Sequence, residues 1–296
     1  MGSVLITGAS SGIGLATAIA LAEAGHIVYA TMRNPDRDTK LRGVIEEKKL
    51  PISILAMDVD SDDSVDRAIS AIRSQGGEIE VLVNNAGIER AGSVEDLSFD
   101  DFRATMETNY FGSLRCIRAV LPAMRDKREG YIINISSIAA RITCSPLAAY
   151  SASKAALEAL SEALAQEMKP FNVHVAIVEP GIIDTAMARR IETPLTNSRY
   201  AQSRRFAGLF QAALANPVPP ALVAERIRDI IESETWQLRH LVGPDAEPFI
   251  GWRFSMTDED WVEWGALEDD EWYARVQSDF GLDARPAARK SSTPHN

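Results

Sequence analysis

A repeating alternation of short apolar runs and amphipathic stretches constrains the fold of this chain more than any other feature. The alternation predicts strands at 4–6, 27–31, 52–57, 79–83, 131–135, 173–178 and 239–242, and helices at 13–24, 61–75, 100–127, 149–169 and 220–233. Strands that alternate with helices form a parallel sheet with helices on both faces and right-handed crossovers. The sequence therefore predicts an α/β fold, with one domain over residues 1–282.

A glycine-rich loop joins the first predicted strand to the first predicted helix. It reads Thr7-Gly8-Ala9-Ser10-Ser11-Gly12-Ile13-Gly14. Glycine lets the backbone approach a ligand closely, and the start of a helix offers unpaired N–H groups and a positive dipole end. The loop predicts a pyrophosphate site for a dinucleotide, with hydroxyl donors from Ser10 and Ser11. The alternative is a tight turn that binds no ligand.

The end of the second predicted strand indicates which nicotinamide cofactor would bind. NAD sites usually place a carboxylate there to hold the ribose hydroxyls. In this chain the position holds Met32, and Arg33 follows it. An arginine can pair with the 2′-phosphate of NADP(H). We therefore expect NADP(H) rather than NAD(H), the alternative being that Arg33 is a solvated loop charge.

Tyr150 and Lys154 lie one helical turn apart on the predicted helix 149–169, so they share a helix face. A free tyrosine has a pKa of about 10, which is high for acid–base catalysis at neutral pH. A neighbouring ammonium favours the phenolate and lowers this pKa. Alone, the spacing fits a surface tyrosine beside a lysine equally well.

Other polar residues fall where predicted strands end, and ligands of parallel sheets bind at that edge. Asn84-Asn85-Ala86-Gly87, Ser137, and Pro180-Gly181 with Thr185 follow three different strands. Asn109 lies in the middle of a predicted helix, where asparagine is unfavourable by propensity. Together with Tyr150 these residues indicate a catalytic site rather than an isolated pair.

These residues resemble the short-chain dehydrogenase/reductase family in order and spacing over about residues 3–190. The matching residues are Thr7-Gly8-x-x-x-Gly12-x-Gly14, Asp58, Asn84-Asn85-Ala86-Gly87, Asn109, Ser137, Tyr150-x-x-x-Lys154, Pro180-Gly181 and Thr185. Residues 28–33 and the Ser10-Ser11 pair resemble the branch that contains 17β-hydroxysteroid dehydrogenase type 1 and retinol dehydrogenases. The resemblance implies a single Rossmann-like domain with a seven-stranded parallel sheet.

The resemblance also implies a role for each matching residue. Tyr150 would be the general acid/base, Lys154 would lower its pKa and contact the nicotinamide ribose, and Ser137 would orient the substrate oxygen. Asn109 would hold a water in a proton relay. Cofactor contacts would come from Gly8, Ser10, Ser11, Gly12, Ile13, Gly14, Arg33, Asp58, Val59, Asn85, Ala86, Gly87, Tyr150, Lys154, Pro180, Gly181, Ile183 and Thr185. We therefore expect an NADP(H)-dependent oxidoreductase that interconverts a ketone or aldehyde and an alcohol.

Two other functions are compatible with such a fold, because fold does not determine function. A non-enzymatic NADP(H)-binding regulator would not need the four catalytic residues together. An epimerase or dehydratase can use the same tyrosine–lysine pair, but those relatives carry a Gly-x-x-Gly-x-x-Gly loop, unlike the spacing found here. The oxidoreductase is the favoured hypothesis.

Apolar residues after Ser137 and within residues 186–217 predict the substrate pocket. The residues expected to contact substrate are Ile138, Cys144, Leu147, Met187, Phe206 and Phe210. We expect Cys144 to pack rather than react. Residues 186–217 are predicted to form a mobile lid over an apolar substrate. Because Arg204 and Arg205 precede the phenylalanines, a membrane-surface contact is the alternative.

The C-terminal region is unusual in composition, since residues 252–282 are acidic and hold four of the five tryptophans. This extension either packs its aromatic rings on the protein's own core or contacts another subunit. Residues 283–296 are expected to be a flexible tail. From the family resemblance we expect a homodimer or homotetramer, formed through the helices at 100–127 and 149–169.

Charge and residue counts exclude several partners. The net charge of −11 repels phosphate backbones, so we expect no nucleic-acid partner. Cys116 and Cys144 are too few for a disulfide framework and fit a cytoplasmic location. The four histidines and two cysteines show no metal-ligand spacing, and no stretch is apolar enough to span a membrane.

Overall fold

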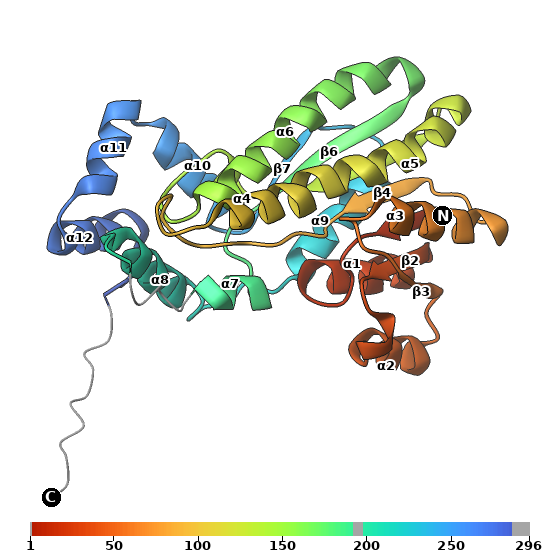
Figure 1. Ribbon diagram of the computed structural model, residues 1–296, viewed down its shortest axis with the longest axis horizontal. Helices are drawn as coiled ribbons and strands as arrows, with labels where there is room; N and C mark the ends of the chain where they lie inside the picture. The colour runs from red at the N-terminus through yellow and green to blue at the C-terminus, as the bar shows by residue number, and fades with distance from the viewer. Residues whose placement is uncertain (1, 192–197, 286–296) are drawn as a thin grey trace, which may run out of the picture.

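Seven parallel strands form one sheet in the order β3-β2-β1-β4-β5-β6-β7 (Figure 1). The computed structural model describes residues 2–191 and 198–285. The strands are β1 (Ser3–Ile6), β2 (Ile27–Met32), β3 (Ile52–Ala56), β4 (Val81–Asn84), β5 (Gly130–Ile135), β6 (Val173–Pro180) and β7 (Arg239–Val242). The predicted Rossmann-like sheet is confirmed, and each strand ends within two residues of its predicted bounds.

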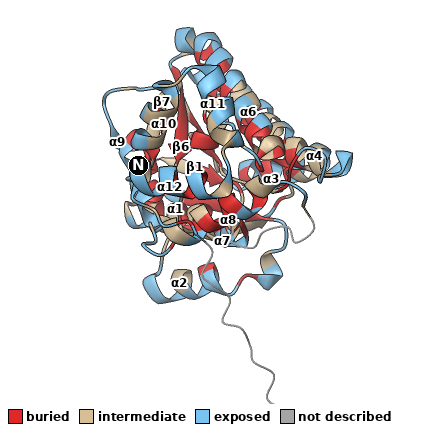
Figure 2. Cartoon of the chain, turned by 90° about the vertical axis from the view of Figure 1, so that its left-hand side faces the viewer, coloured by how far each residue is buried: buried red, intermediate tan, exposed pale blue. Residues whose placement is uncertain are grey.

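Helices cover both faces of the sheet because successive strand residues point to opposite sides. One face packs on α1 (Gly12–Glu23), α2 (Lys40–Lys48) and α9 (Ala221–Glu232), and the other on α3 (Asp62–Ser74), α5 (Gly112–Lys127) and α6 (Ala148–Met168). In β1, Val4 and Ile6 join the first core while Leu5 joins the second. Figure 2 shows buried residues concentrated along the strands and on the helix faces that touch them.

The predicted helix 100–127 is divided by one wide turn. It consists of α4 (Phe99–Met106), a π-helical turn at Glu107–Phe111, and α5. Single π-helical turns often occur at functional sites, and this one contains the Asn109 singled out above. The helix α2 was not predicted, because it is short and charged and buries one residue, Leu41.

The C-terminal half of the chain adds a group of helices at one end of the sheet. It comprises α7 (Ala186–Ile191), α8 (Ala201–Ala213), α10 (Ala246–Phe254), α11 (Asp258–Ala266) and α12 (Asp269–Phe280). In Figure 1, α8, α10, α11 and α12 gather on the left of the molecule. The predicted lid 186–217 contains α7 and α8, and its residues 192–197 lie outside the described residues. Residues 286–296 of the predicted tail also lie outside them.

None of the helices in the described part of the chain has the length and apolarity needed to cross a membrane.

Candidate active site

The loop between β1 and α1 has the backbone conformation that its glycines predict. Gly8 and Gly12 adopt positive φ angles of +68° and +56°. A Cβ at Gly14 would lie 2.5 Å from the carbonyl oxygen of Gly8, and a Cβ at Gly12 would lie 3.3 Å from Thr185 Cγ2. The loop is therefore tightly folded, and it approaches the segment that follows β6.

The start of α1 retains the donors that an anion requires. Ser11 is the N-cap, but its side chain makes no capping hydrogen bond, and the first turn contains no acidic residue. Both Ser10 and Ser11 are exposed. An uncapped helix N-terminus beside a close-packed glycine loop fits the pyrophosphate of a dinucleotide.

The segment after β4 holds the glycine loop in place. Asn85 Nδ2 donates hydrogen bonds to the carbonyl oxygens of Thr7 (2.9 Å) and Gly8 (3.1 Å). The Thr7 hydroxyl accepts bonds from the backbone N–H groups of Asn85 and Ala86. The Asn85 side chain thus shapes the cofactor loop from behind. A Cβ at Gly87 would lie 3.2 Å from Asn109 Oδ1 and 3.7 Å from Lys154 Nζ, so a side chain there would crowd Asn109.

Asn109 connects this segment to α6. Its Oδ1 accepts a hydrogen bond from Ile88 N (2.8 Å), while Nδ2 donates to Ile88 O and to Ser153 Oγ (both 2.9 Å). The residue is fully buried, and both hydrogens of its side-chain amide are used. Its side chain therefore aligns the end of β4 with the helix that carries Tyr150. The water-holding role stays a prediction.

Ser137, Tyr150 and Lys154 come together at the carboxyl end of β5. The Ser137 side chain lies close enough to the Tyr150 phenol to act on its pKa. The Lys154 ammonium is buried, donates to Ile135 O (2.7 Å), and lies 5.8 Å from the centroid of the Tyr150 ring. The structure therefore assembles three of the four predicted catalytic side chains at one place, and Asn109 lies directly behind them.

The pKa values at this site are controlled by burial. Burial raises the pKa of Tyr150 to about 12, although the nearby Ser137 hydroxyl acts in the opposite direction. Burial also lowers the pKa of Lys154 to about 8. Loss of hydration is the largest influence on the pKa of Tyr150. The expected lowering of this pKa by Lys154 stays a prediction. A phenol with this pKa is protonated at neutral pH.

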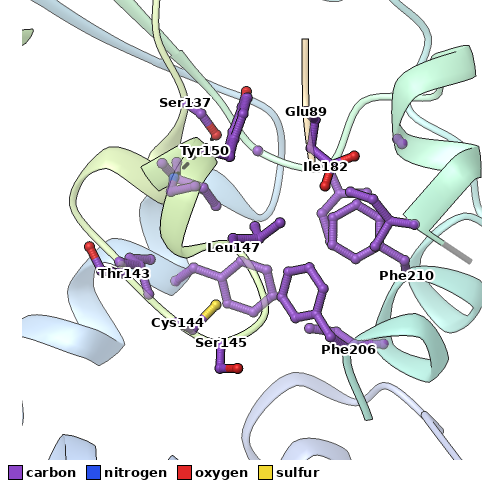
Figure 3. Close-up of a pocket in the computed structure, with 18 of the residues that line it drawn as sticks. Glu89, Ser137, Thr143, Cys144, Ser145, Leu147, Tyr150, Ile182, Phe206 and Phe210 are labelled. Atoms are coloured by element: carbon purple, nitrogen blue, oxygen red, sulfur yellow. Dashed lines mark hydrogen bonds between the residues drawn. The ribbon is translucent and has the colours of Figure 1, made fainter. Parts of the chain in front are cut away.

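A large cavity of about 540 Å³ opens beside Tyr150. All six predicted substrate residues line it: Ile138, Cys144, Leu147, Met187, Phe206 and Phe210. Figure 3 shows Ser137 and Tyr150 at one end of this cavity and Cys144, Ser145 and Phe206 toward the other. Burial raises the pKa of the Cys144 thiol to about 12, which agrees with a packing role. The Tyr150 phenol therefore faces a mainly apolar chamber.

The tryptophan-rich extension closes the far part of this cavity. Trp252, Trp261, Trp264 and Trp272 all line it. The Trp261 and Trp264 rings stack with centroids 5.5 Å apart, and Trp252 contacts both edge-on. The extension therefore packs its rings within its own subunit, one of the two predicted alternatives, and it also forms a pocket wall that the sequence reasoning missed. These tryptophans lie far along the chain from the predicted site motifs, so the sequence did not indicate that they would line the same cavity.

An ion-pair network holds the predicted lid against the extension. Arg205 Nε lies 2.7 Å and Arg204 Nη2 2.6 Å from the Asp269 carboxylate. The Arg205 side chain is only 6% exposed. These two arginines therefore join α8 to α12. The membrane-surface contact that they suggested as an alternative stays untested.

Glu89 is another cavity residue that was not predicted from the sequence. It follows Gly87 by two residues, lines the cavity, and is drawn beside Ile182 in Figure 3. Its Oε1 is buried without a hydrogen-bond partner among residues 2–191 and 198–285. Burial raises its pKa to about 7. An acidic residue just after the Asn-Asn-Ala-Gly segment was the available signal, since that segment ends a strand at the site.

The remaining predicted residues divide into two groups. Ile13, Pro180, Gly181, Ile183 and Thr185 line the cavity with the catalytic residues. Arg33, Asp58 and Val59 follow β2 and β3 and do not line it. The cofactor contacts assigned to both groups stay predictions.

Comparison with known proteins agrees with this geometry. Residues 3–195 match the family model for short chain dehydrogenases. The chain is 38% identical over 245 residues to 3-ketodihydrosphingosine reductase from Bacteroides thetaiotaomicron, covering 81% of this chain and 87% of that protein. It is 40% identical over 202 residues to human retinol dehydrogenase 8, covering 67% and 64% of the two chains. The crystal structure of a short-chain dehydrogenase from Streptomyces avermitilis superposes with a TM-score of 0.75 and 32% identity, over 89% and 95% of the chains.

Proposed function

Since this chain belongs to the short chain dehydrogenase family, we propose that it is an NADP(H)-dependent oxidoreductase that interconverts a ketone or aldehyde and an alcohol on an apolar molecule. One observation carries the proposal. The phenol of Tyr150 lies near Ser137 and the buried Lys154 and faces an apolar cavity. A reduced nicotinamide, when bound, supplies the hydride for such a reaction.

The side chains of the site have complementary tasks in the proposed reaction. A substrate carbonyl in the cavity accepts hydrogen bonds from Ser137 and Tyr150. Tyr150 gives its proton to the oxygen as negative charge develops there, and its raised pKa keeps that proton available at neutral pH. Lys154 supplies positive charge next to the phenolate that remains. The apolar walls exclude water from the reacting oxygen.

The cofactor would lie along the carboxyl edge of the sheet. Its pyrophosphate would bind at the glycine loop and the start of α1. Asp58 and Val59 would face the adenine, and Thr185 with the Pro180-Gly181 turn would meet the nicotinamide. Asn85 supports this site through the loop that it holds.

The preference for NADP(H) is proposed from the exposed Arg33 at the end of β2. We expect Arg33→Ala to raise KM for NADPH about tenfold or more, because a charge-assisted hydrogen bond to the 2′-phosphate would be lost. KM for NADH, which lacks this phosphate, would change little. Steady-state kinetics with both cofactors measure the difference, and Arg37→Ala, at a nearby exposed arginine, is the matched control. Equal losses with both cofactors would contradict the proposed phosphate contact.

We also propose that α8 acts as a substrate lid, pinned by Asp269. Asp269→Ala would leave the buried Arg205 without its partner, at a cost of about 1 kcal/mol or more at this contact. We expect limited proteolysis within residues 201–213 to be about fivefold faster, with a higher KM for apolar ketones. Asp279→Ala, at an exposed position on α12, is the control. Unchanged cleavage in the Asp269 variant would argue against this anchor.

We also propose an oligomeric state and a cellular location. Ala155, Ala159 and Ala163 present exposed small side chains along α6, which would permit close helix packing in a homodimer or homotetramer. Light scattering measures the oligomer mass directly. Cys116 and Cys144 are free thiols, which favours the reducing cytoplasm.

The proposed function is tested by NADPH oxidation with a panel of hydrophobic ketones, run beside NADH. We expect turnover that prefers NADPH and increases with the apolar size of the ketone. Tight NADPH binding without turnover on any ketone would instead support a non-enzymatic regulator.

A further inference from the structure

Glu89 differs in charge from the other residues that line the cavity. It is the one acidic side chain among the described residues of that lining, and most of its neighbours there are apolar. Glu89 is half-buried, and its Oε1 is the oxygen that is buried without a hydrogen-bond partner in the described chain. Removing a carboxylate oxygen from water without such a partner is costly. An unpaired carboxylate oxygen in a ligand cavity therefore indicates that the ligand itself supplies the hydrogen-bond donor.

The protein's own cations do not satisfy this carboxylate. Arg90 and Arg190 act on Glu89 at a distance, but neither makes an ion pair with it within the described chain. Arg90 instead pairs with Asp101 at 3.5 Å. The other cations that line the cavity are also engaged, since Lys154 donates to Ile135 O and Arg205 pairs with Asp269.

Glu89 lies at the reacting end of the cavity. Its charge acts on the Tyr150 phenol and raises the pKa of that group. Figure 3 places its carboxylate on the side of the cavity that holds Tyr150 and Ser137, away from Cys144 and Ser145. A substrate group that reaches Glu89 must therefore be attached near the carbonyl carbon rather than at the apolar end.

We propose that Glu89 is a specificity residue that binds a cationic amino group close to the reacting carbonyl, so that the preferred substrates are amino ketones with an apolar body. This inference rests on the proposed reductase function. An ammonium satisfies the orphan oxygen with a charge-assisted hydrogen bond and compensates the buried charge. The apolar body would extend along the wall formed by Phe206 and the tryptophans.

A matched pair of ketones tests this proposal. β-(Dimethylamino)propiophenone carries a cationic amine, and isohexanophenone replaces that nitrogen with a CH group in the same shape. We expect Glu89→Gln to lower the ratio of kcat/KM for the amine over its isostere about tenfold to a hundredfold, mainly through KM. Glu89→Asp, which keeps the charge on a shorter side chain, would retain part of the ratio.

Controls separate this result from misfolding and from failure of the reductase proposal. Glu46→Gln makes the same chemical change at an exposed position on α2 and should leave the ratio at its wild-type value. Binding of each ketone, followed by fluorescence of the cavity tryptophans, needs no turnover. If neither ketone is reduced, the reductase proposal fails for this class, while the binding ratio still tests Glu89. A ratio that is the same in wild type and Glu89→Gln, in kinetics or in binding, would overturn the proposal.

The pH dependence supplies a second readout. The groups that act electrostatically on Glu89 or respond to it are Arg90, Arg190 and Tyr150. Because burial raises the pKa of Glu89 to about 7, the carboxylate forms as the pH rises through that value. The preference for the amine should therefore increase from below to above pH 7 in wild type and stay flat in Glu89→Gln. An equal slope in both proteins would also contradict the role of Glu89.

Discussion

Replacing Tyr150 with phenylalanine is expected to lower kcat for ketone reduction by about 100-fold or more. The change removes one oxygen atom, and with it the proton donor and one of two hydrogen-bond donors to the substrate oxygen. Ser137 would remain, but it cannot replace a phenol that is held beside Lys154. Single-turnover measurements of NADPH oxidation with a saturating ketone would measure the loss in the chemical step.

The matched control for this variant is Tyr131→Phe on β5. Tyr131 is half-buried and packs edge-on against His174 at 5.1 Å, away from the cavity. The Tyr131→Phe variant also loses a single hydroxyl, so its kcat for ketone reduction should equal that of the wild-type protein. NADPH affinity of Tyr150→Phe should stay within a few-fold of wild type, because the glycine loop is untouched. A Tyr150→Phe enzyme with near wild-type turnover would refute the assignment of the general acid.

The second large effect is expected from Gly14→Ala. The added Cβ would lie 2.4 Å from Asn85 Nδ2 and 2.5 Å from the carbonyl oxygen of Gly8. Both atoms belong to the hydrogen-bonded contact that shapes the glycine loop, and one is backbone, so the loop must move. We expect the Kd for NADPH to rise about tenfold to a hundredfold, measured by quenching of tryptophan fluorescence.

Gly43→Ala is the control for this substitution. Gly43 lies within α2, and nothing lies within 4 Å of the Cβ that would be added. Alanine there should leave NADPH affinity unchanged and stabilise the protein by about 0.5–1 kcal/mol, because glycine is unfavourable inside a helix. If Gly14→Ala binds NADPH as tightly as Gly43→Ala does, the glycine loop is not the cofactor site.

The sheet and the grouping of most candidate site residues could be predicted because their signals are local. Apolar runs and turn residues locate parallel strands, and the functional residues of such sheets follow strand ends. Ser137 and Thr185 were found in this way, and the structure places both at one cavity. The pair Tyr150 and Lys154 also needed only the period of a helix.

Features that depend on tertiary burial could not be read from the sequence. The spacing of Tyr150 and Lys154 indicates a lowered phenol pKa, whereas burial in the folded chain raises it. The four tryptophans of the extension line the cavity because α10, α11 and α12 fold back over the carboxyl edge of the sheet. Glu89 is an ordinary loop residue until the fold encloses it among apolar side chains.

The most direct test of hydride transfer at this site uses NADPH in which both hydrogens on the reactive nicotinamide carbon are replaced by deuterium. Purified protein is incubated with this cofactor and a hydrophobic ketone, and the product is examined by mass spectrometry. The account predicts that the wild-type protein forms an alcohol with one deuterium on its carbinol carbon. The Tyr150→Phe protein should form much less of this alcohol. Binding of the cofactor with no deuterated alcohol from any ketone tested would contradict the account.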